Sequence, residues 1–259
     1  MKRTALIIIL AVACNAYGQD KILPAEARPF VPRGYEMLDY MTGDLNGDKR
    51  PDAIMILRQP GEDTLYDDGQ VRPLILMLRQ PNGRLKQEKR NDKMVLCRHC
   101  GGAFGDPYAA GKIEGNGFNL NFYGGSNWRW VYDYTFSYNP ATRNWMLTKE
   151  TQESFNSGDP DMTIKETNIG AAELAGINFD NFNASPAYDD SRWKVSAAKT
   201  FFYDSPGLGN KPRKGYLVMG NVATGIRELK NFVEISFANT KEEFTTGYIL
   251  KKDLVKIKK

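Results

Sequence analysis

The chain has 259 residues, 41% of them hydrophobic and 25% charged, which is typical of a globular protein and excludes a disordered one. Its formal charge of +4 is too small for this length to indicate a nucleic-acid-binding protein. The chain contains a single histidine, His99, so most metal hydrolases and most catalysts that pair serine or cysteine with histidine are excluded unless His99 takes part.

Residues 1–18 have the pattern of a secretory signal peptide. A start with two basic residues precedes an apolar run over residues 5–13, which is too short to span a bilayer. The small residues Ala16 and Gly18 favour cleavage before Gln19. The sequence therefore predicts an exported protein, periplasmic or extracellular.

Cys14 offers an alternative end to the export signal. It follows an aliphatic stretch, as a lipidated cysteine does, although Ala11 stands where a bulkier aliphatic residue is expected. Lipid anchoring through Cys14 therefore stays open. No later apolar stretch approaches the length of a membrane span, so we expect no transmembrane span.

Charge divides the remaining chain into three segments. Residues 19–155 have a net charge of zero, residues 156–190 have −6 and residues 191–259 have +8. We interpret them as a β-domain, an acidic connector and a basic C-terminal module, and we expect the connector to dock onto the module within the chain. Within the connector, residues 162–167 favour a strand and residues 170–182 a short helical turn.

The carboxylate-rich segment 44–52, Asp-Leu-Asn-Gly-Asp-Lys-Arg-Pro-Asp, is the most informative local feature. Its positions 1, 3, 5 and 9 carry oxygen-bearing side chains, from Asp44, Asn46, Asp48 and Asp52. With the carbonyl of Arg50 at position 7 and water, a tight loop could supply the about six or seven oxygens that Ca²⁺ prefers. The alternative is a loop of Asx turns without a metal.

Short apolar runs bounded by turn residues predict an all-β first domain. Residues 52–57 and 74–78 are rich in Ile, Leu and Met, and residues 118–122 alternate between apolar and asparagine side chains. Turn residues at 82–83 separate such runs, and residues 145–147 begin a further strand.

Residues 128–138 alternate more clearly than any other part of the chain. Every second residue is aromatic, which places six rings on one face of a strand: Trp128, Trp130, Tyr132, Tyr134, Phe136 and Tyr138. We expect these rings to pack the core, because large rings bury much apolar surface. The alternative is a ligand-binding face, since exposed Trp and Tyr rings stack on sugars or on peptide prolines.

Cys97 and Cys100 are the two cysteines left after removal of a signal peptide. In an exported protein such a close pair favours a disulfide. The spacing also matches redox Cys-x-x-Cys motifs, but the glycine-rich residues 101–107 predict a loop where a redox pair needs a helix N-terminus to lower the thiol pKa. Zinc would have at most three ligands here, Cys97, His99 and Cys100.

The 44–52 pattern resembles the calcium loops of FG-GAP and VCBS type, which occur in β-propellers and related extracellular domains. Position 6 of such loops is normally glycine, because the backbone there has a positive φ, and here it is Lys49. The ammonium group of Lys49 would weaken ion binding. The chain has only one such loop, which excludes a full propeller of repeated blades.

A wider stretch, residues 30–155, resembles a family of exported bacterial proteins of unknown function. The resemblance is carried by Phe-Val-Pro-Arg-Gly-Tyr at 30–35, by the Cys-Arg-His-Cys-Gly-Gly motif with Phe-Gly-Asp-Pro at 104–107, and by Gly-Gly-Ser-Asn-Trp-Arg-Trp at 124–130. It implies no chemical activity.

Residues 191–259 resemble a bacterial SH3-like domain. The supporting segments include the strand-like residues 232–237 and Gly-Tyr-Ile at 247–249 before a one-turn 3₁₀ segment at 252–254. Short strands at a spacing of about 10–15 residues independently fit a small barrel. The resemblance implies binding of cell-wall peptides or other envelope proteins, with Tyr203, Tyr216 and Tyr248 as candidate ligand-groove residues or, equally, as core residues.

We therefore expect a mainly β protein, with an N-terminal antiparallel β-domain followed by a small SH3-like β-barrel. The leading hypothesis is a non-enzymatic envelope binding or scaffolding protein with a structural Ca²⁺ and an envelope peptide, polymer or protein as partner. The alternatives are an accessory to a cell-wall hydrolase, a thiol oxidoreductase, and an inhibitor or immunity-type interaction protein. A hydrolase would need a carboxylate pair, and Glu62 and Asp63 lie in a polar loop where we expect them to be solvated.

Overall fold

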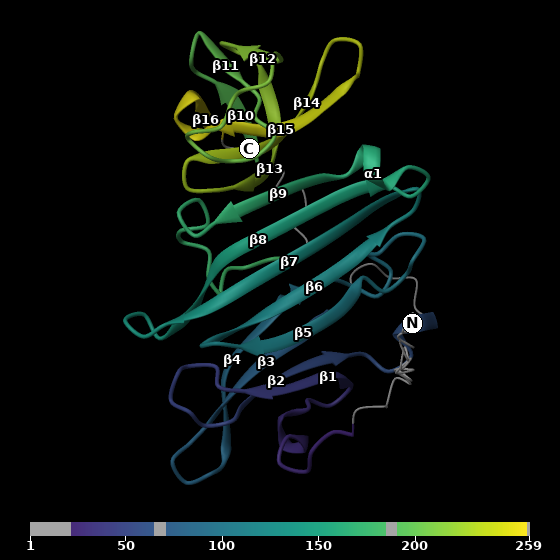
Figure 1. The fold of residues 1–259 in the computed structure, drawn as a ribbon, viewed down its shortest axis with the longest axis vertical. Helices are drawn as coiled ribbons and strands as arrows, with labels where there is room; N and C mark the ends of the chain where they lie inside the picture. The colour runs from purple at the N-terminus through teal and green to yellow at the C-terminus, as the bar shows by residue number, and fades with distance from the viewer. Residues whose placement is uncertain (1–21, 65–70, 185–190, 258–259) are drawn as a thin grey trace, which may run out of the picture.

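The computed structural model describes residues 22–64, 71–184 and 191–257 (Figure 1). These residues form sixteen strands, one four-residue helix and three 3₁₀ turns, so the mainly β prediction is confirmed. Within the same residues, no helix is long and apolar enough to cross a membrane. Residues 1–18, predicted as a signal peptide, and Cys14 among them lie outside the described residues.

The first sheet is an antiparallel meander in the order β1-β2-β3-β4, with β1 (Glu36–Gly43), β2 (Asp52–Arg58), β3 (Arg72–Arg79) and β4 (Leu85–Val95). The central strands β2 and β3 contain the apolar runs predicted at 52–57 and 74–78. Both runs are unbroken because both faces of these strands are buried. One face belongs to a core shared with the second sheet, and the segment before β1, with η1 (Arg28–Phe30), covers the other.

The second sheet is a five-stranded antiparallel meander, with β5 (Tyr108–Glu114), β6 (Gly117–Gly125), β7 (Trp128–Asn139), β8 (Asn144–Asn156) and β9 (Lys165–Gly170) in chain order. Its inner face carries Phe118, Leu120, Phe122, Phe136 and Trp145 into the shared core. Tyr134 and Phe136 of the aromatic row on β7 are buried, whereas Trp130, Tyr132 and Tyr138 are half-buried and Trp128 is 55% exposed. The core interpretation therefore holds for the middle of the strand and fails at its start.

The connector predicted at 156–190 needs correction, because its first half belongs to the second sheet. After the four-residue helix α1 (Pro160–Thr163), β9 pairs with β8 from Lys165 to Gly170. Residues 170–182 form hydrogen-bonded turns, and the N–H groups of Leu174 and Phe182 bond carbonyls four residues earlier, as in a single helical turn. Phe179 and Phe182 fill the shared core. The charge pattern could not reveal this, because a sheet edge is exposed and accepts acidic side chains as readily as a linker does.

The C-terminal unit contains β10 (Arg192–Val195), β11 (Lys199–Phe201), β12 (Tyr216–Val218), β13 (Val222–Glu228), β14 (Phe232–Ala238), β15 (Phe244–Leu250), η3 (Lys251–Asp253) and β16 (Leu254–Ile257). Five strands form a sheet in the order β15-β14-β13-β10-β16, and β11 and β12 form a separate hairpin. The predicted strands and 3₁₀ turn are present, the turn beginning one residue earlier. The predicted closed barrel is not present, because β15 and β16 are opposite edges of the sheet. An isolated bridge between Tyr203 and Tyr248 joins the residues after β11 to β15.

The C-terminal unit packs directly against the second sheet, beyond β9 (Figure 1). Leu229, Phe232 and Tyr248 of this unit belong to the same buried cluster as the sheet residues. The contact also includes Glu173, whose carbonyl accepts the N–H of Lys230 at 3.0 Å and whose carboxylate accepts the side-chain amide of Asn231 at 2.9 Å. One continuous core therefore runs from the first sheet into the C-terminal unit.

Candidate functional site

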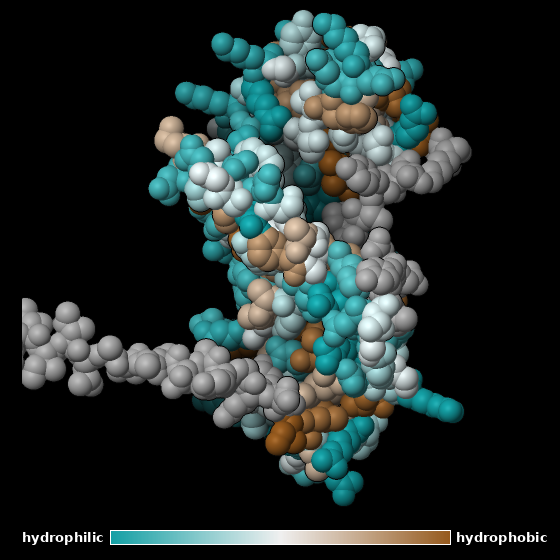
Figure 2. Space-filling model, turned by 90° about the vertical axis from the view of Figure 1, so that its right-hand side faces the viewer, coloured by the Kyte–Doolittle hydropathy of each residue, from teal (hydrophilic) through white to brown (hydrophobic). Residues whose placement is uncertain are grey.

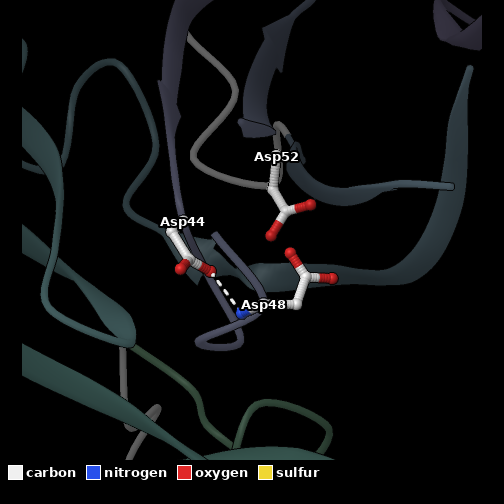
Figure 3. A group of neighbouring side chains, drawn as sticks. All are labelled: Asp44, Asp48 and Asp52. Atoms are coloured by element: carbon white, nitrogen blue, oxygen red, sulfur yellow. Dashed lines mark hydrogen bonds between the residues drawn. The ribbon is translucent and has the colours of Figure 1, made fainter. Parts of the chain in front are cut away.

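The predicted carboxylate loop connects β1 to β2 and brings three acidic side chains together. Carboxylate oxygens of Asp44, Asp48 and Asp52 all lie within 4.8 Å of one another (Figure 3). Asp52 begins β2, so the strand fixes one side of the cluster, while Asp44 and Asp48 come from the loop itself. The structure thus assembles the acidic part of the predicted ligand set.

Asp44 organises the loop backbone. Its Oδ1 accepts the backbone N–H groups of Asn46 at 3.2 Å, Gly47 at 2.7 Å and Asp48 at 3.2 Å, and its Oδ2 accepts that of Lys49 at 2.8 Å. Burial opposes the charge of Asp44, but these four N–H groups outweigh it and lower its pKa. The tight turn therefore depends on an ionised Asp44.

Lys49 occupies the left-handed backbone conformation, with φ at 63°. This is the conformation that the resemblance to calcium loops implied for position 6. For a residue with a Cβ it costs free energy that glycine would not. The backbone N–H of Lys49 bonds Asp44, which holds the residue in this conformation.

Asp52 is fully buried and anchors the loop to the sheet. Its Oδ2 accepts the N–H of Leu45 at 3.0 Å, and its Oδ1 accepts the N–H of Arg79 in β3 at 2.7 Å. Burial raises the pKa of Asp52; the two N–H groups act in the opposite direction, and the carboxylates of Asp48 and Asp44 raise it further. A cation beside these three groups would relieve the repulsion among them.

The other two predicted ligands are turned toward the loop backbone. The side-chain oxygen of Asn46 accepts the N–H of Asp48 at 3.1 Å, and the carbonyl of Arg50 accepts the N–H of Asp52 at 3.0 Å. The guanidinium group of Arg50 bonds the carboxylate of Asp48. The hard oxygen donors fit Ca²⁺, but an ion would have to replace the guanidinium group of Arg50 at Asp48.

The loop is also bonded to the second sheet. Leu45 is fully buried, and its carbonyl accepts the indole N–H of Trp145 in β8 at 2.8 Å. A change in the geometry of this loop would therefore disturb the contact between the two sheets.

Cys97 and Cys100 form a disulfide, with a Cα–Cα distance of 5.2 Å. The glycine-rich sequence predicted a loop after the pair, and the residues that follow do form turns and not a helix. Gly101 donates its N–H to the carbonyl of Gly105 at 2.9 Å, and a Cβ at Gly101 would lie only 2.4 Å from that oxygen. The glycines therefore permit a close backbone turn beside the disulfide.

A buried charge cluster around Arg72 was missed from the sequence. Arg72, at the start of β3, is fully buried and bonds the carboxylates of Glu62 in η2 (Glu62–Thr64) and Asp106, as well as the carbonyl of Leu96. Burial opposes the charge of Arg72, but the hydrogen bonds to Asp106 and Glu62 raise its pKa. We expected Glu62 to be solvated, and this expectation is wrong, because Glu62 is buried against Arg72. The sequence did offer one signal for this cluster: Arg72 stands next to the apolar run 74–78, where a charge needs a partner.

The three candidate groove tyrosines do not share one open surface. Tyr248 is 4% exposed and belongs to the core between the C-terminal unit and the second sheet, while Tyr203 packs edge-on against Phe232 beside it. Tyr216 is 51% exposed, on the hairpin, where the ammonium group of Lys199 lies 3.8 Å from its ring centre. A groove formed by all three rings is not present.

Comparison with models of protein families, with curated proteins and with solved structures found no match to this chain.

Proposed function

We propose that the protein is a non-enzymatic binding or scaffolding protein of the cell envelope, with a β-domain stabilised by Ca²⁺ in the 44–52 loop. The observation that carries the calcium site is the convergence of Asp44, Asp48 and Asp52 within 4.8 Å, on a loop bonded to both sheets. An ion there would hold β1, β2 and β3 together through their carboxylate and backbone contacts. The N-terminal signal pattern supports export to the envelope.

The surroundings of the cysteine pair support binding over thiol chemistry. A redox disulfide needs a feature that lowers the thiol pKa, such as a helix N-terminus. Cys97 and Cys100 instead lie in a turn-rich segment that is bonded to the end of β6 through Gly101 and Gly125. This arrangement is typical of a structural disulfide.

The basic C-terminal unit supports an envelope peptide, polymer or protein as partner. Of the connector carboxylates in the described residues, that of Glu173 bonds the C-terminal unit, through Asn231. Another connector carboxylate, Asp180, bonds Lys89 of the first sheet. The charge of +8 on residues 191–259 would steer the unit toward an anionic surface.

Thermal unfolding of the chain from residue 19, in Ca²⁺ and in EDTA, tests the calcium site. At a free Ca²⁺ concentration of 100 times Kd, a bound ion stabilises the fold by about 2.7 kcal/mol, which raises Tm measurably. Asp48→Asn should abolish the difference between Ca²⁺ and EDTA. The matched control is Asp92→Asn, an exposed carboxylate paired with Arg90, which should retain it. Equal Tm values for the unmodified chain in Ca²⁺ and EDTA would reject the calcium site.

A further inference from the structure

Two cavities lie between the second sheet and the C-terminal unit. The first has a volume of about 480 Å³ and is lined by β7 and β8, by residues 177–184 and by β13 and β14. The second, of about 520 Å³, lies next to it and shares Tyr132 and Gln152 with it. Figure 2 shows a recess at this level, below the C-terminal unit, where hydrophilic and hydrophobic side chains lie side by side. Both volumes fall in the range of small-molecule sites.

One wall of these cavities is a row of aromatic rings on β7. Trp130 and Tyr132 stack with ring centres 5.0 Å apart, and Tyr132 lies 6.1 Å from Tyr134. Alternate residues of a strand point to the same face, so the rings follow one another along the wall. Because Trp130 and Tyr132 are only half-buried, part of each ring is left for contact with a ligand.

A buried charge cluster lies beside this row of rings. Its members Glu150 and Gln152, on β8, pair directly with Tyr134 and Tyr132. Its other members, Arg227 and Glu234, come from β13 and β14 of the C-terminal unit. Glu150 is fully buried; one of its oxygens accepts Arg227 Nη1 at 2.5 Å, and the other accepts Gln152 Nε2 at 2.6 Å. A second carboxylate, from Glu234, lies 3.7 Å from Arg227 Nη2, which is too long for a hydrogen bond. Arg227 Nε and Nη2 are buried without a hydrogen-bond partner of good geometry.

The cluster around Arg72 is a comparison within the same chain: a buried arginine whose side-chain nitrogens all have hydrogen-bond acceptors. Arg72 Nε and both of its Nη atoms bond carboxylate or carbonyl oxygens, as a purely structural buried arginine requires. Arg227 also faces two carboxylates but bonds only one of them, and it lines a cavity. Buried donors without a hydrogen-bond partner beside the carboxylate of Glu234 suit a ligand that both accepts and donates hydrogen bonds.

The balance of donors and acceptors selects the class of ligand. A simple cation would leave the donors of Arg227 unsatisfied, and a simple anion would be repelled by Glu150 and Glu234. Burial raises the pKa of Glu234, and the charge of Arg227 opposes this rise. Sugar hydroxyl groups donate and accept, and the C–H face of a sugar ring stacks on aromatic rings.

We propose that the two neighbouring cavities bind a neutral saccharide, with sugar rings on the Trp130–Tyr132 wall and hydroxyl groups on Arg227, Glu234 and Gln152. This proposal rests on the proposed binding function and names its ligand class. It assigns the site to the contact between the two units, so neither unit should bind the ligand alone.

Calorimetric titration of the chain from residue 19 tests this site. The probes are three soluble tetrasaccharides: β-1,4-linked N-acetylglucosamine, β-1,4-linked glucose and α-1,4-linked glucose. At least one should bind, and Tyr132→Ala should weaken its binding about tenfold or more. The matched control is Trp128→Ala, on the same strand but outside the residues that line either cavity, which should leave affinity unchanged. Glu234→Gln, nearly equal in size, tests the polar wall without removing packing and should also weaken binding.

Absence of binding by all three tetrasaccharides at millimolar concentration would overturn the saccharide site, as would equal affinity of the Tyr132→Ala and Trp128→Ala variants. Binding of a small amine or carboxylate that Glu234→Gln abolishes would assign the cavity to another ligand class. Cosedimentation with isolated cell envelopes separates the two proposals. Cosedimentation that neither a tetrasaccharide nor Tyr132→Ala reduces would support the envelope function and overturn this site, whereas saccharide binding without cosedimentation would support the site alone.

Discussion

The indole nitrogen of Trp145 donates a hydrogen bond to the backbone carbonyl of Leu45 at 2.8 Å, and both side chains are fully buried. This contact joins the second sheet to the carboxylate loop. Trp145→Phe would keep an aromatic ring but leave the carbonyl unpaired, at a cost of about 1–3 kcal/mol, with a further cost for the space left by the indole. Urea unfolding measures the loss.

The matched control for Trp145→Phe is Trp128→Phe, because Trp128 is 55% exposed. We expect this variant to stay within about 0.5 kcal/mol of the parent. Equal unfolding free energies for the two variants would show that the bond between the sheets contributes nothing.

Replacing Asp44 by Asn should destabilise the protein in a pH-dependent way, even in EDTA. The lowered pKa of Asp44 means that its ionised form contributes stability, fully present above the unfolded-state value of 3.8 and lost as pH falls through the lower folded value. The difference in unfolding free energy between the parent and Asp44→Asn should therefore be largest near neutral pH and shrink below pH 3.8. Denaturant titrations across this range measure it. A constant difference from pH 7 to pH 2 would contradict the role of the charge.

Removing the guanidinium group of Arg72 should be strongly destabilising. Arg72→Met leaves the buried carboxylate of Glu62 and the partly buried one of Asp106 without their cation, and the loss of one partner from a buried pair costs about 3–5 kcal/mol. Arg90→Met is the control, because Arg90 and Asp92 pair at the surface, where the cost is about 0–1 kcal/mol. Similar unfolding free energies for both variants would refute a structural role for Arg72.

The disulfide between Cys97 and Cys100 should contribute modestly to stability, because it closes a short loop. The chain-entropy relation gives about 2 kcal/mol for a loop of this length. The double variant Cys97→Ser/Cys100→Ser should lose about this amount of unfolding free energy. The chain from residue 19 should show no free thiol in a colorimetric assay under native conditions; two reactive thiols would favour the thiol oxidoreductase alternative.

Local patterns in the sequence were sufficient for the strands with a clear apolar run or alternation and for the loop, but not for strands such as β1, β4 and β5. The alternation over 118–122 and 128–138 has the period of a strand, and these residues lie in β6 and β7. The 44–52 loop was predictable for a similar reason: Asp44 bonds N–H groups only two to five residues away, so neighbours in the chain decide its shape.

What the sequence determined by itself is therefore the set of elements whose causes lie within a few residues: the strands, the acidic turn and the close cysteine pair. Only the tertiary structure decided that Glu62 and Asp106 neutralise Arg72, that Glu150 reaches Arg227 across 77 positions, and that β9 completes the second sheet. Those pairings depend on which surfaces are buried against each other. Burial makes an unpaired charge costly, and it is this cost, absent from any local pattern, that selects partners far apart in the chain.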